Sequence, residues 1–191
     1  VGSEMCIRDS PGTTYFVEKW FKKSGTKVDI AFCPERIAEG YAIKELVELP
    51  QIISSTTERG YKRAKKIFRL LTKDIVKLSP IEAELAKLFT NTWRYIKFAT
   101  ANQFFMIAND HGVDFHKIHR AMTYKYERAK DLPGPGFAAG PCLFKDAMQL
   151  AAFNNNSFYL GHAAMLINEG LPNYIVDKIK RKYNLSKLTV G

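Results

Sequence analysis

The hydrophobic and polar positions of residues 80–110 repeat with the period of an α-helix. Apolar and small side chains recur every three or four residues, at Ile81, Leu85, Leu88, Thr92, Ile96 and Ala99. Ser79 to Glu82 form a capping-box pattern with proline at the first helical position, and Gly112 marks the end. About 30 residues at 1.5 Å each predict a helix of roughly 45 Å. A helix of that length with aromatic residues on several sides needs partners, and dimerisation across it is a natural solution.

A different pattern precedes this helix. Short apolar runs rich in strand-forming residues occupy 28–33, 50–54 and 74–78, and helical patterns lie before and between them. Such alternation predicts a parallel sheet, like the second half of a doubly wound nucleotide-binding domain. No Gly-x-Gly-x-x-Gly occurs in the chain. The turn that would hold a dinucleotide pyrophosphate is therefore missing from it.

The rest of the chain predicts helices only. Their expected positions are near residues 114–125, 145–154, 157–169 and 172–182, and Pro172 would open the last one. Residues 1–10 show no helical or strand period and resemble a leader that recurs in translated environmental sequence reads, so we exclude them as a non-native leader. The predicted fold is an α/β segment over residues 11–78, followed by an all-α domain with one long central helix.

Composition narrows the functional class. The 191 residues are 46% hydrophobic and 13% aromatic, enough for a globular core. We expect a cytoplasmic protein, because no long apolar run or secretion signal is present and three scattered cysteines suit a reducing compartment. We expect no metal site, since His116 and His119 have no third ligand.

The net charge of +10 raises the question of nucleic-acid binding. The one dense basic group falls on a single helical pattern, at Lys62, Arg63, Lys65, Lys66 and Arg69. Because apolar residues alternate with these positions, we interpret the group as the solvated face of an amphipathic helix. A basic protein equally suits a diphosphate ligand, and we expect no nucleic-acid partner.

The helical region is interrupted by a segment rich in glycine and proline, residues 131–146. Gly134, Gly136 and Gly140 permit close approach of the backbone to a ligand, and Cys142 follows directly. A thiol at the start of a helix is favoured as thiolate by the helix dipole, and Lys145 adds positive charge nearby. From the residues alone, a buried inert cysteine is an equally good interpretation.

Two further groups of residues are candidates for chemistry. Lys87 and Asn91 lie four residues apart on the long helix and so share a face, although an ordinary surface lysine with a neighbouring asparagine explains them as well. Glu35 and Glu39 follow a predicted strand, at the sheet edge where such folds bind ligands. An ordinary pair of loop carboxylates is the alternative there.

Taken in order, these segments resemble the successive signatures of the UDP-glucose/GDP-mannose 6-dehydrogenase family, the nucleotide-sugar dehydrogenases that include UDP-N-acetylmannosamine dehydrogenases. The segments are Pro11-Gly-Thr-Thr, Pro34-Glu-Arg-Ile-Ala-Glu-Gly, Glu84-Leu-Ala-Lys-Leu-Phe-Thr-Asn, and the stretch from Gly134 to Asp146. The resemblance implies that residues 11–78 are the C-terminal part of a Rossmann NAD-binding domain and 79–183 a central dimerisation domain. Residues 184–191 would begin a UDP-binding domain.

The resemblance also implies a reaction, in which NAD oxidises the C6 alcohol of a UDP-sugar in two steps and Cys142 captures the intermediate aldehyde. Lys87 and Asn91 would stabilise the oxyanion, and Asp146 would assist proton movement. Glu35 and Glu39 would position substrate and water, with Glu35 also reaching the cofactor. Gly134, Gly136 and Phe137 would line the sugar pocket, Lys145 would bind the substrate, and Arg128 would reach the substrate of a neighbouring subunit.

Two departures from the family pattern and two alternatives remain. The family's more usual Gly-Phe-Gly-Gly before the cysteine is Gly-Phe-Ala-Ala-Gly here, and the leader replaces the threonine-bearing turn before Pro11. One alternative is a non-catalytic helical dimerisation module. The other is an enzyme like 6-phosphogluconate or 3-hydroxyacid dehydrogenases, which need no nucleophilic cysteine because they stop after one hydride transfer.

Overall fold

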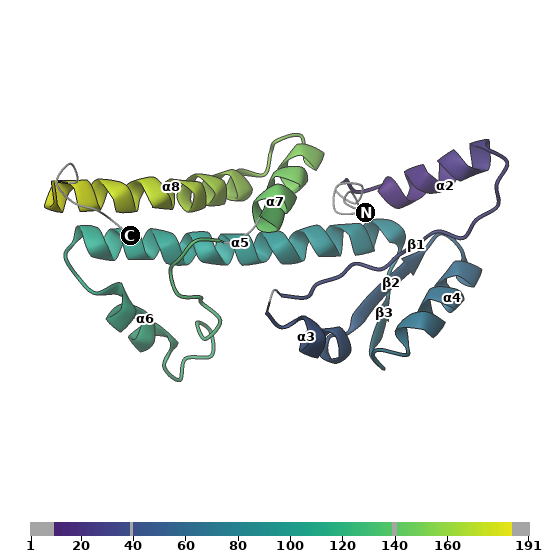
Figure 1. Ribbon diagram of the computed structural model, residues 1–191, viewed down its shortest axis with the longest axis horizontal. Helices are drawn as coiled ribbons and strands as arrows, with labels where there is room; N and C mark the ends of the chain where they lie inside the picture. The colour runs from purple at the N-terminus through teal and green to yellow at the C-terminus, as the bar shows by residue number, and fades with distance from the viewer. Residues whose placement is uncertain (1–9, 39, 139–140, 185–191) are drawn as a thin grey trace. The chain divides into compact units, whose positions relative to one another are not determined.

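A computed structural model describes residues 10–38, 40–138 and 141–184 (Figure 1). The chain divides into two compact units, Val1–Thr90 and Asn91–Gly191. The first unit holds a small sheet with helices, and the second unit is helical in its described part. This order of an α/β segment before an all-α segment confirms the predicted fold class.

The first unit alternates helices and strands in the predicted manner. Its elements are α2 (Thr13–Lys23), β1 (Ala31–Phe32), α3 (Ala42–Glu48), β2 (Gln51–Ser55), α4 (Glu58–Phe68) and β3 (Ile75–Lys77). The strands form one sheet in the order β1-β2-β3. Ile52, Ile53 and Ser54 of the central strand are buried, which places the core of this unit around β2.

The sheet is mixed, so the prediction of a parallel sheet was wrong for one strand pair. β2 and β3 are parallel, whereas β1 and β2 are antiparallel, with Ala31 opposite Ser55. Serine hydroxyls strengthen this pair, because Ser54 Oγ donates to the Phe32 carbonyl and Ser55 Oγ to the Ile30 carbonyl. A hydrophobic run specifies a strand but not its direction, and an antiparallel edge strand on a parallel sheet is common.

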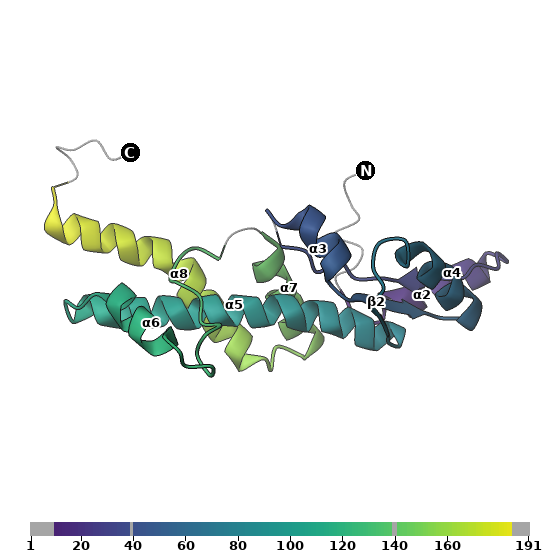
Figure 2. The same cartoon turned by 90° about the horizontal axis from the view of Figure 1, so that it is seen from below.

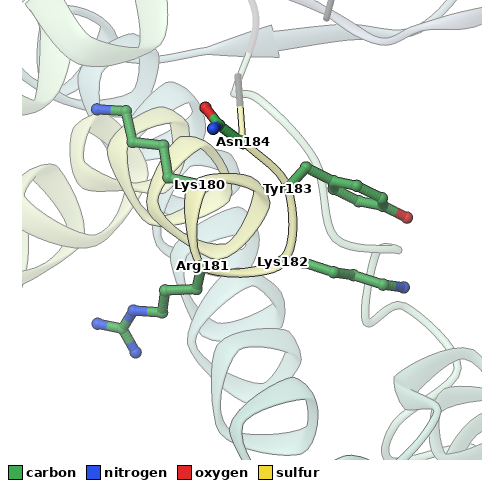
Figure 3. A pocket seen from close by; sticks show the side chains of 5 residues that line it. All are labelled: Lys180, Arg181, Lys182, Tyr183 and Asn184. Carbon is green, nitrogen blue, oxygen red and sulfur yellow. The ribbon is translucent and has the colours of Figure 1, made fainter. Parts of the chain in front are cut away.

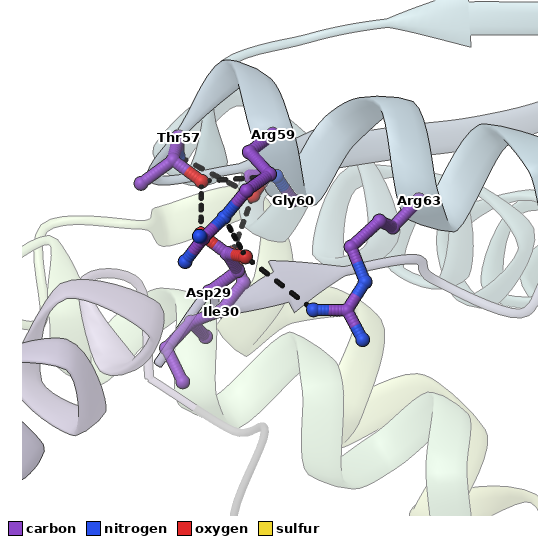
Figure 4. Close-up of polar contacts among 7 residues, drawn as sticks. Asp29, Ile30, Thr57, Arg59, Gly60 and Arg63 are labelled. Carbon is purple, nitrogen blue, oxygen red and sulfur yellow. Dashed lines mark hydrogen bonds and ion pairs between the residues drawn. The ribbon is translucent and has the colours of Figure 1, made fainter. Parts of the chain in front are cut away.

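Asp29 ties the approach to β1 to the N-terminus of α4 (Figure 4). Its carboxylate accepts hydrogen bonds from Thr57 Oγ1 and from Arg59 Nε, both at 2.7 Å. Thr57 is the N-cap of α4 and accepts the Gly60 N–H. A Cβ at Gly60 would lie 2.3 Å from Ser55 Oγ, so only glycine permits this close packing. The bonds from Thr57 and Arg59 lower the pKa of Asp29.

Helix α5 (Pro80–Asp110) has 31 residues and begins where the sequence predicted. The capping box is confirmed, since Glu82 Oε2 accepts the Ser79 N–H at 2.7 Å and Ser79 Oγ accepts the Glu82 N–H at 3.4 Å. Its first turns belong to the first unit. There Glu84 accepts hydrogen bonds from the start of α2.

The second unit packs the rest of α5 against α6 (Phe115–Thr123), α7 (Pro141–Phe153) and α8 (Tyr159–Lys182). Its core cluster combines residues of α5, α7 and α8: Tyr95, Ala99, Leu143, Ala147 and Ala164. Helix α8 lies beside α5 in both views and runs in the same direction (Figures 1 and 2). Side-chain bonds join the two helices along their length, from Tyr95 to Glu169 and from Asn109 to Tyr174.

Two helix boundaries differ from the prediction. Residues 157–169 and 172–182 were expected as separate helices, but α8 is continuous and contains Pro172 in its interior. An internal proline costs about 3 kcal/mol, and α8 continues through it with Leu171 and Asn168, one and four residues earlier, buried. Helix α7 begins at Pro141 rather than near residue 145. Cys142 therefore lies within the first turn of α7.

Candidate active site

A buried polar pair lies beside the candidate cysteine in the second unit. Asn91 Nδ2 of α5 donates to Asp146 Oδ2 of α7 at 2.6 Å, and both side chains are buried. Lys145 Nζ lies 3.4 Å from the other carboxylate oxygen of Asp146. Cys142 is partly exposed and precedes Asp146 by four residues, so helical periodicity puts them on one face of α7. The structure thus gathers four of the predicted residues around the start of one helix.

The glycine-rich segment before α7 is anchored to the same unit. Asn102 of α5 forms hydrogen bonds with both backbone groups of Gly136. Phe137, the next residue, is 60% exposed, and Gly134 is exposed as well. Arg128 lies earlier, in the turns after α6, where it is exposed and its guanidinium stacks on the Tyr126 ring at 5.2 Å.

The first unit brings Lys87 and Glu35 together. Lys87 Nζ lies 4.0 Å from Glu35 Oε2, and the Glu35 side chain is 55% exposed. Its other carboxylate oxygen accepts the Ile37 N–H, which fixes the turn after β1. Glu39, predicted beside it, lies outside the described residues.

The two described cysteines differ in environment. Cys33 follows β1 and is half-buried, and burial raises the pKa of its thiol to about 11. A thiol with that pKa is almost wholly protonated at neutral pH and is a poor nucleophile. Cys142 lies at a helix start with Lys145 three residues away. The comparison favours Cys142 over Cys33 as the nucleophile.

The densest basic groups lie on helix surfaces. Lys62, Arg63 and Lys66 of α4 are exposed, as the interpretation of a solvated face predicts. At the C-terminal end of α8, Lys180 to Asn184 line a shallow hollow of about 460 Å³. In Figure 3 the side chains of Lys180, Arg181 and Lys182 point in different directions away from the helix. Diverging cations at a helix C-terminus complement the helix dipole.

Sequence reasoning missed two buried polar residues of α5, Glu84 and Asn102. Glu84 is 3% exposed and Asn102 is fully buried. A usable signal was present, because Glu84, Asn91 and Asn102 are spaced by seven and eleven residues, which returns each to nearly the same helix face. Asparagine is unfavourable in a helix interior unless its side chain has a partner. Within the described residues, no group of three His, Cys, Asp or Glu could hold a metal ion.

Comparison with known proteins decides the family. Residues 81–169 match the sequence model of the UDP-glucose/GDP-mannose dehydrogenase family, central domain. The chain belongs to this family. The match covers α5 from Ile81 onward, with Lys87 and Asn91, and also Cys142 and Asp146.

Individual relatives extend the match beyond this domain. UDP-N-acetyl-D-mannosamine dehydrogenase of Methanocaldococcus jannaschii is 32% identical over 94% of this chain. The structure of a UDP-D-ManNAc dehydrogenase from Pyrococcus horikoshii is 28% identical, with a TM-score of 0.81, over 91% of this chain and 44% of that one. A UDP-glucose dehydrogenase structure from Pyrobaculum islandicum also gives 0.81, at 25% identity, over 91% of this chain and 42% of that one. The chain spans 42% of the length of the M. jannaschii relative.

None of the described helices combines the length and apolar character needed to cross a bilayer.

Proposed function

We propose that this chain supplies the nucleophile and the oxyanion-binding residues of an NAD-dependent nucleotide-sugar 6-dehydrogenase. Its substrate is a UDP-linked hexose or hexosamine, and its product is the corresponding uronic acid, a precursor for polysaccharide synthesis. The observation that carries the proposal is the buried Asn91–Asp146 pair one helical turn from Cys142. The similarity to UDP-N-acetyl-D-mannosamine dehydrogenases favours an N-acetylated hexosamine as the sugar.

The described residues form only part of a cofactor site. In dinucleotide-binding folds the pyrophosphate rests on a helix N-terminus, but at the start of α2 the Glu84 carboxylate already accepts the Gly12 and Thr14 N–H groups. We therefore do not place the pyrophosphate at the start of α2, and among the described residues we keep Glu35 as the cofactor-facing residue. NAD, when bound, accepts a hydride in each of the two oxidations.

Cys142 carries the intermediate between the two oxidations. Its thiolate adds to C6 of the aldehyde, so that a C–S bond forms as the C=O π bond breaks, and the oxygen takes up the proton that the C6 hydroxyl released in the first oxidation, which gives a thiohemiacetal. The second oxidation removes that proton and the C6 hydride and leaves a thioester. Water then adds to the thioester carbon, the C–S bond breaks, and the Cys142 thiolate and the carboxylate product are released, while the two protons of the water pass by way of nearby carboxylates to solvent.

The neighbouring residues have roles suited to their chemistry. The Lys87 ammonium and the Asn91 amide stabilise negative charge on the C6 oxygen. Asp146 moves protons beside Cys142 and, through its bond to Asn91 Nδ2, orients that amide. Glu35, paired with Lys87, and Glu39 position the substrate and activate the hydrolytic water.

The sugar nucleotide contacts the segment before α7. Gly134 and Gly136 let the backbone approach the sugar, Phe137 packs against it, and Lys145 balances diphosphate charge. Arg128, exposed beside Tyr126, reaches the substrate of a neighbouring subunit.

Assembly is the second part of the proposal, as a homodimer or larger homo-oligomer through α5. Large apolar side chains of this helix are exposed to solvent, and these are Phe89, Trp93, Phe104 and Ile107. A surface of this kind on a monomer is typical of an interface between subunits. A non-catalytic dimerisation module would share this property, so assembly alone does not distinguish the two functions.

The distinguishing experiment uses the complete gene product that contains this segment. Cys142→Ser should bind UDP-sugar but lose steady-state acid production by several orders of magnitude, because a serine hydroxyl does not ionise near neutral pH. Cys33→Ser should leave the rate nearly unchanged. Near-normal turnover with two NAD reduced per sugar by Cys142→Ser would refute the proposal. A single hydride transfer by the unmodified enzyme would favour the 6-phosphogluconate or 3-hydroxyacid dehydrogenase alternative.

The 191-residue chain by itself should not turn over, since it lacks a pyrophosphate-binding turn. NAD reduction by this chain with any UDP-sugar would contradict that expectation.

A further inference from the structure

The segment between α6 and α7 is tied to the second unit at three points. His119 Nε2 lies 2.9 Å from the Leu132 carbonyl oxygen. Asn102 binds Gly136, and Ala138 packs against the core cluster of α5, α7 and α8. Phe137 lies between two of these anchored residues and yet is 60% exposed. Its outward position therefore follows from the anchoring of its neighbours.

Asn102 recognises the backbone of Gly136 on both sides. Its Oδ1 accepts the Gly136 N–H at 2.8 Å, and its Nδ2 donates to the Gly136 carbonyl at 2.9 Å. A primary amide is the side-chain group that offers one acceptor and a donor in this arrangement. Asn102 is fully buried, and its amide pairs with both backbone groups of Gly136, much as a residue of a neighbouring β-strand would.

A second amide fixes the orientation of the first. Asn102 Nδ2 also donates to Asn168 Oδ1 at 2.9 Å, and Asn168 Nδ2 donates to the Tyr95 carbonyl at 3.0 Å. The side-chain amide nitrogens of Asn102 and Asn168 both face acceptors. A flipped Asn102 amide would direct its oxygen toward the Gly136 carbonyl and Asn168 Oδ1. The network joins α5 and α8 to the glycine-rich segment, and its members are buried where unpaired polar groups are costly.

We propose that Asn102 is a positioning residue that holds residues 134–137 in the conformation that presents Phe137 to the sugar nucleotide. This inference rests on the proposed function, which gives the segment its ligand. Asn102 itself is buried behind the segment and acts through the Gly136 backbone. Loss of its amide should loosen the segment and weaken recognition of the sugar while leaving the helices in place.

The first test needs only the 191-residue chain. In the unmodified chain the Gly136 amide should exchange its hydrogen more slowly than the exposed Gly134 amide, because Gly136 has a buried acceptor. Asn102→Ala should accelerate Gly136 exchange roughly 10- to 100-fold, the range expected for losing two hydrogen bonds. Equal exchange of Gly134 and Gly136 in the unmodified chain would overturn the inference even if Asn102→Ala failed to fold.

A matched control lies on the same helix. Asn109 donates its amide to the Tyr174 hydroxyl at 3.0 Å, an exposed contact between α5 and α8 that does not involve residues 134–137. Asn109→Ala should leave Gly136 exchange unchanged. Equal acceleration in both variants would show a general loosening of the helices and would contradict a specific role of Asn102.

The second test uses the complete gene product and compares two ligands. Asn102→Ala should weaken binding of the UDP-sugar roughly 10- to 100-fold while UDP alone binds within about twofold of the unmodified enzyme, since residues 134–137 contact only the sugar. Asn109→Ala should change neither affinity. Unchanged UDP-sugar binding by Asn102→Ala would overturn the inference and leave the proposed function intact. An unmodified enzyme that oxidises no UDP-sugar would instead refute the proposed function, whereas the Gly136 exchange result would still stand.

Discussion

Glu84 joins the start of α2 to α5 across 70 residues of sequence, and its removal should destabilise the first unit. One carboxylate oxygen accepts the Gly12 N–H at 2.5 Å. The other accepts both the N–H and the hydroxyl of Thr14, at 2.8 and 2.6 Å. Glu84 and Thr14 are 3% and 5% exposed. The carboxylate thus lies at a helix N-terminus, where the dipole favours negative charge.

The expected cost of Glu84→Ala follows from these contacts. Hydrogen bonds to a charged group contribute about 1.5–3 kcal/mol each, and the three share one side chain and so are not additive. The variant also leaves the Thr14 N–H buried without an acceptor, so a loss of about 3–5 kcal/mol is expected. For a unit of roughly 100 residues, each kcal/mol lowers Tm by about 4–8 °C. The first unit should therefore unfold at least about 12 °C earlier.

The assay is thermal unfolding of the 191-residue chain by calorimetry, with Glu82→Ala as the control. Glu82 is exposed, lies two residues earlier on the same helix, and contributes only the capping-box contact with Ser79. Its removal should cost about 1 kcal/mol. Glu84→Gln should lie between these two variants, because its amide oxygen can still accept the Thr14 N–H and hydroxyl while its amide nitrogen would face the Gly12 N–H. If Glu84→Ala lowers Tm no more than Glu82→Ala does, the reasoning is refuted.

Asp29 should titrate below its ordinary pKa of about 3.9, since Thr57 and Arg59 stabilise its charged form. The folding stability that it contributes should be fully present above the unfolded-state pKa and lost as pH falls through the folded-state pKa. NMR titration checks this, and an unshifted Asp29 would contradict it. At neutral pH iodoacetamide should modify Cys142 before Cys33, whose pKa is raised to about 11, as peptide mass spectrometry would detect; faster labelling of Cys33 would contradict this. Residues 11–191 should sediment as a dimer at micromolar concentration, and a well-folded monomer would contradict assembly through α5.

The sequence predicted what depends on local signals. The capping box at Ser79 lies within four residues and proved correct in both of its hydrogen bonds. The length of α5 followed because no proline or glycine interrupts residues 81–110. Local signals also misled, since Pro172 normally opens a helix but here lies inside α8.

The missed features depend on partners that are distant in sequence. β1 pairs antiparallel with β2 at Ser54 and Ser55, whose hydroxyls donate to the Phe32 and Ile30 carbonyls, and a short apolar run carries no information about this pairing. Asn102 finds Gly136 and Asn168 at separations of 34 and 66 residues. From hydrophobic periodicity alone, Asn102 is only a polar residue that interrupts an apolar helix face. Its burial becomes explicable once the backbone groups that it satisfies are known.

The same packing explains how the chain accommodates a departure from the family pattern. A second glycine more usually follows Gly-Phe in this family, and Ala138 stands there instead. Ala138 is partly buried and packs against the core cluster of Tyr95, Ala99, Leu143, Ala147 and Ala164. Alanine in place of glycine thus reduces the backbone flexibility at position 138 and adds an apolar contact. Both neighbours of Phe137 are therefore held in place. Gly136 is held by hydrogen bonds to Asn102, and Ala138 by packing against the core cluster.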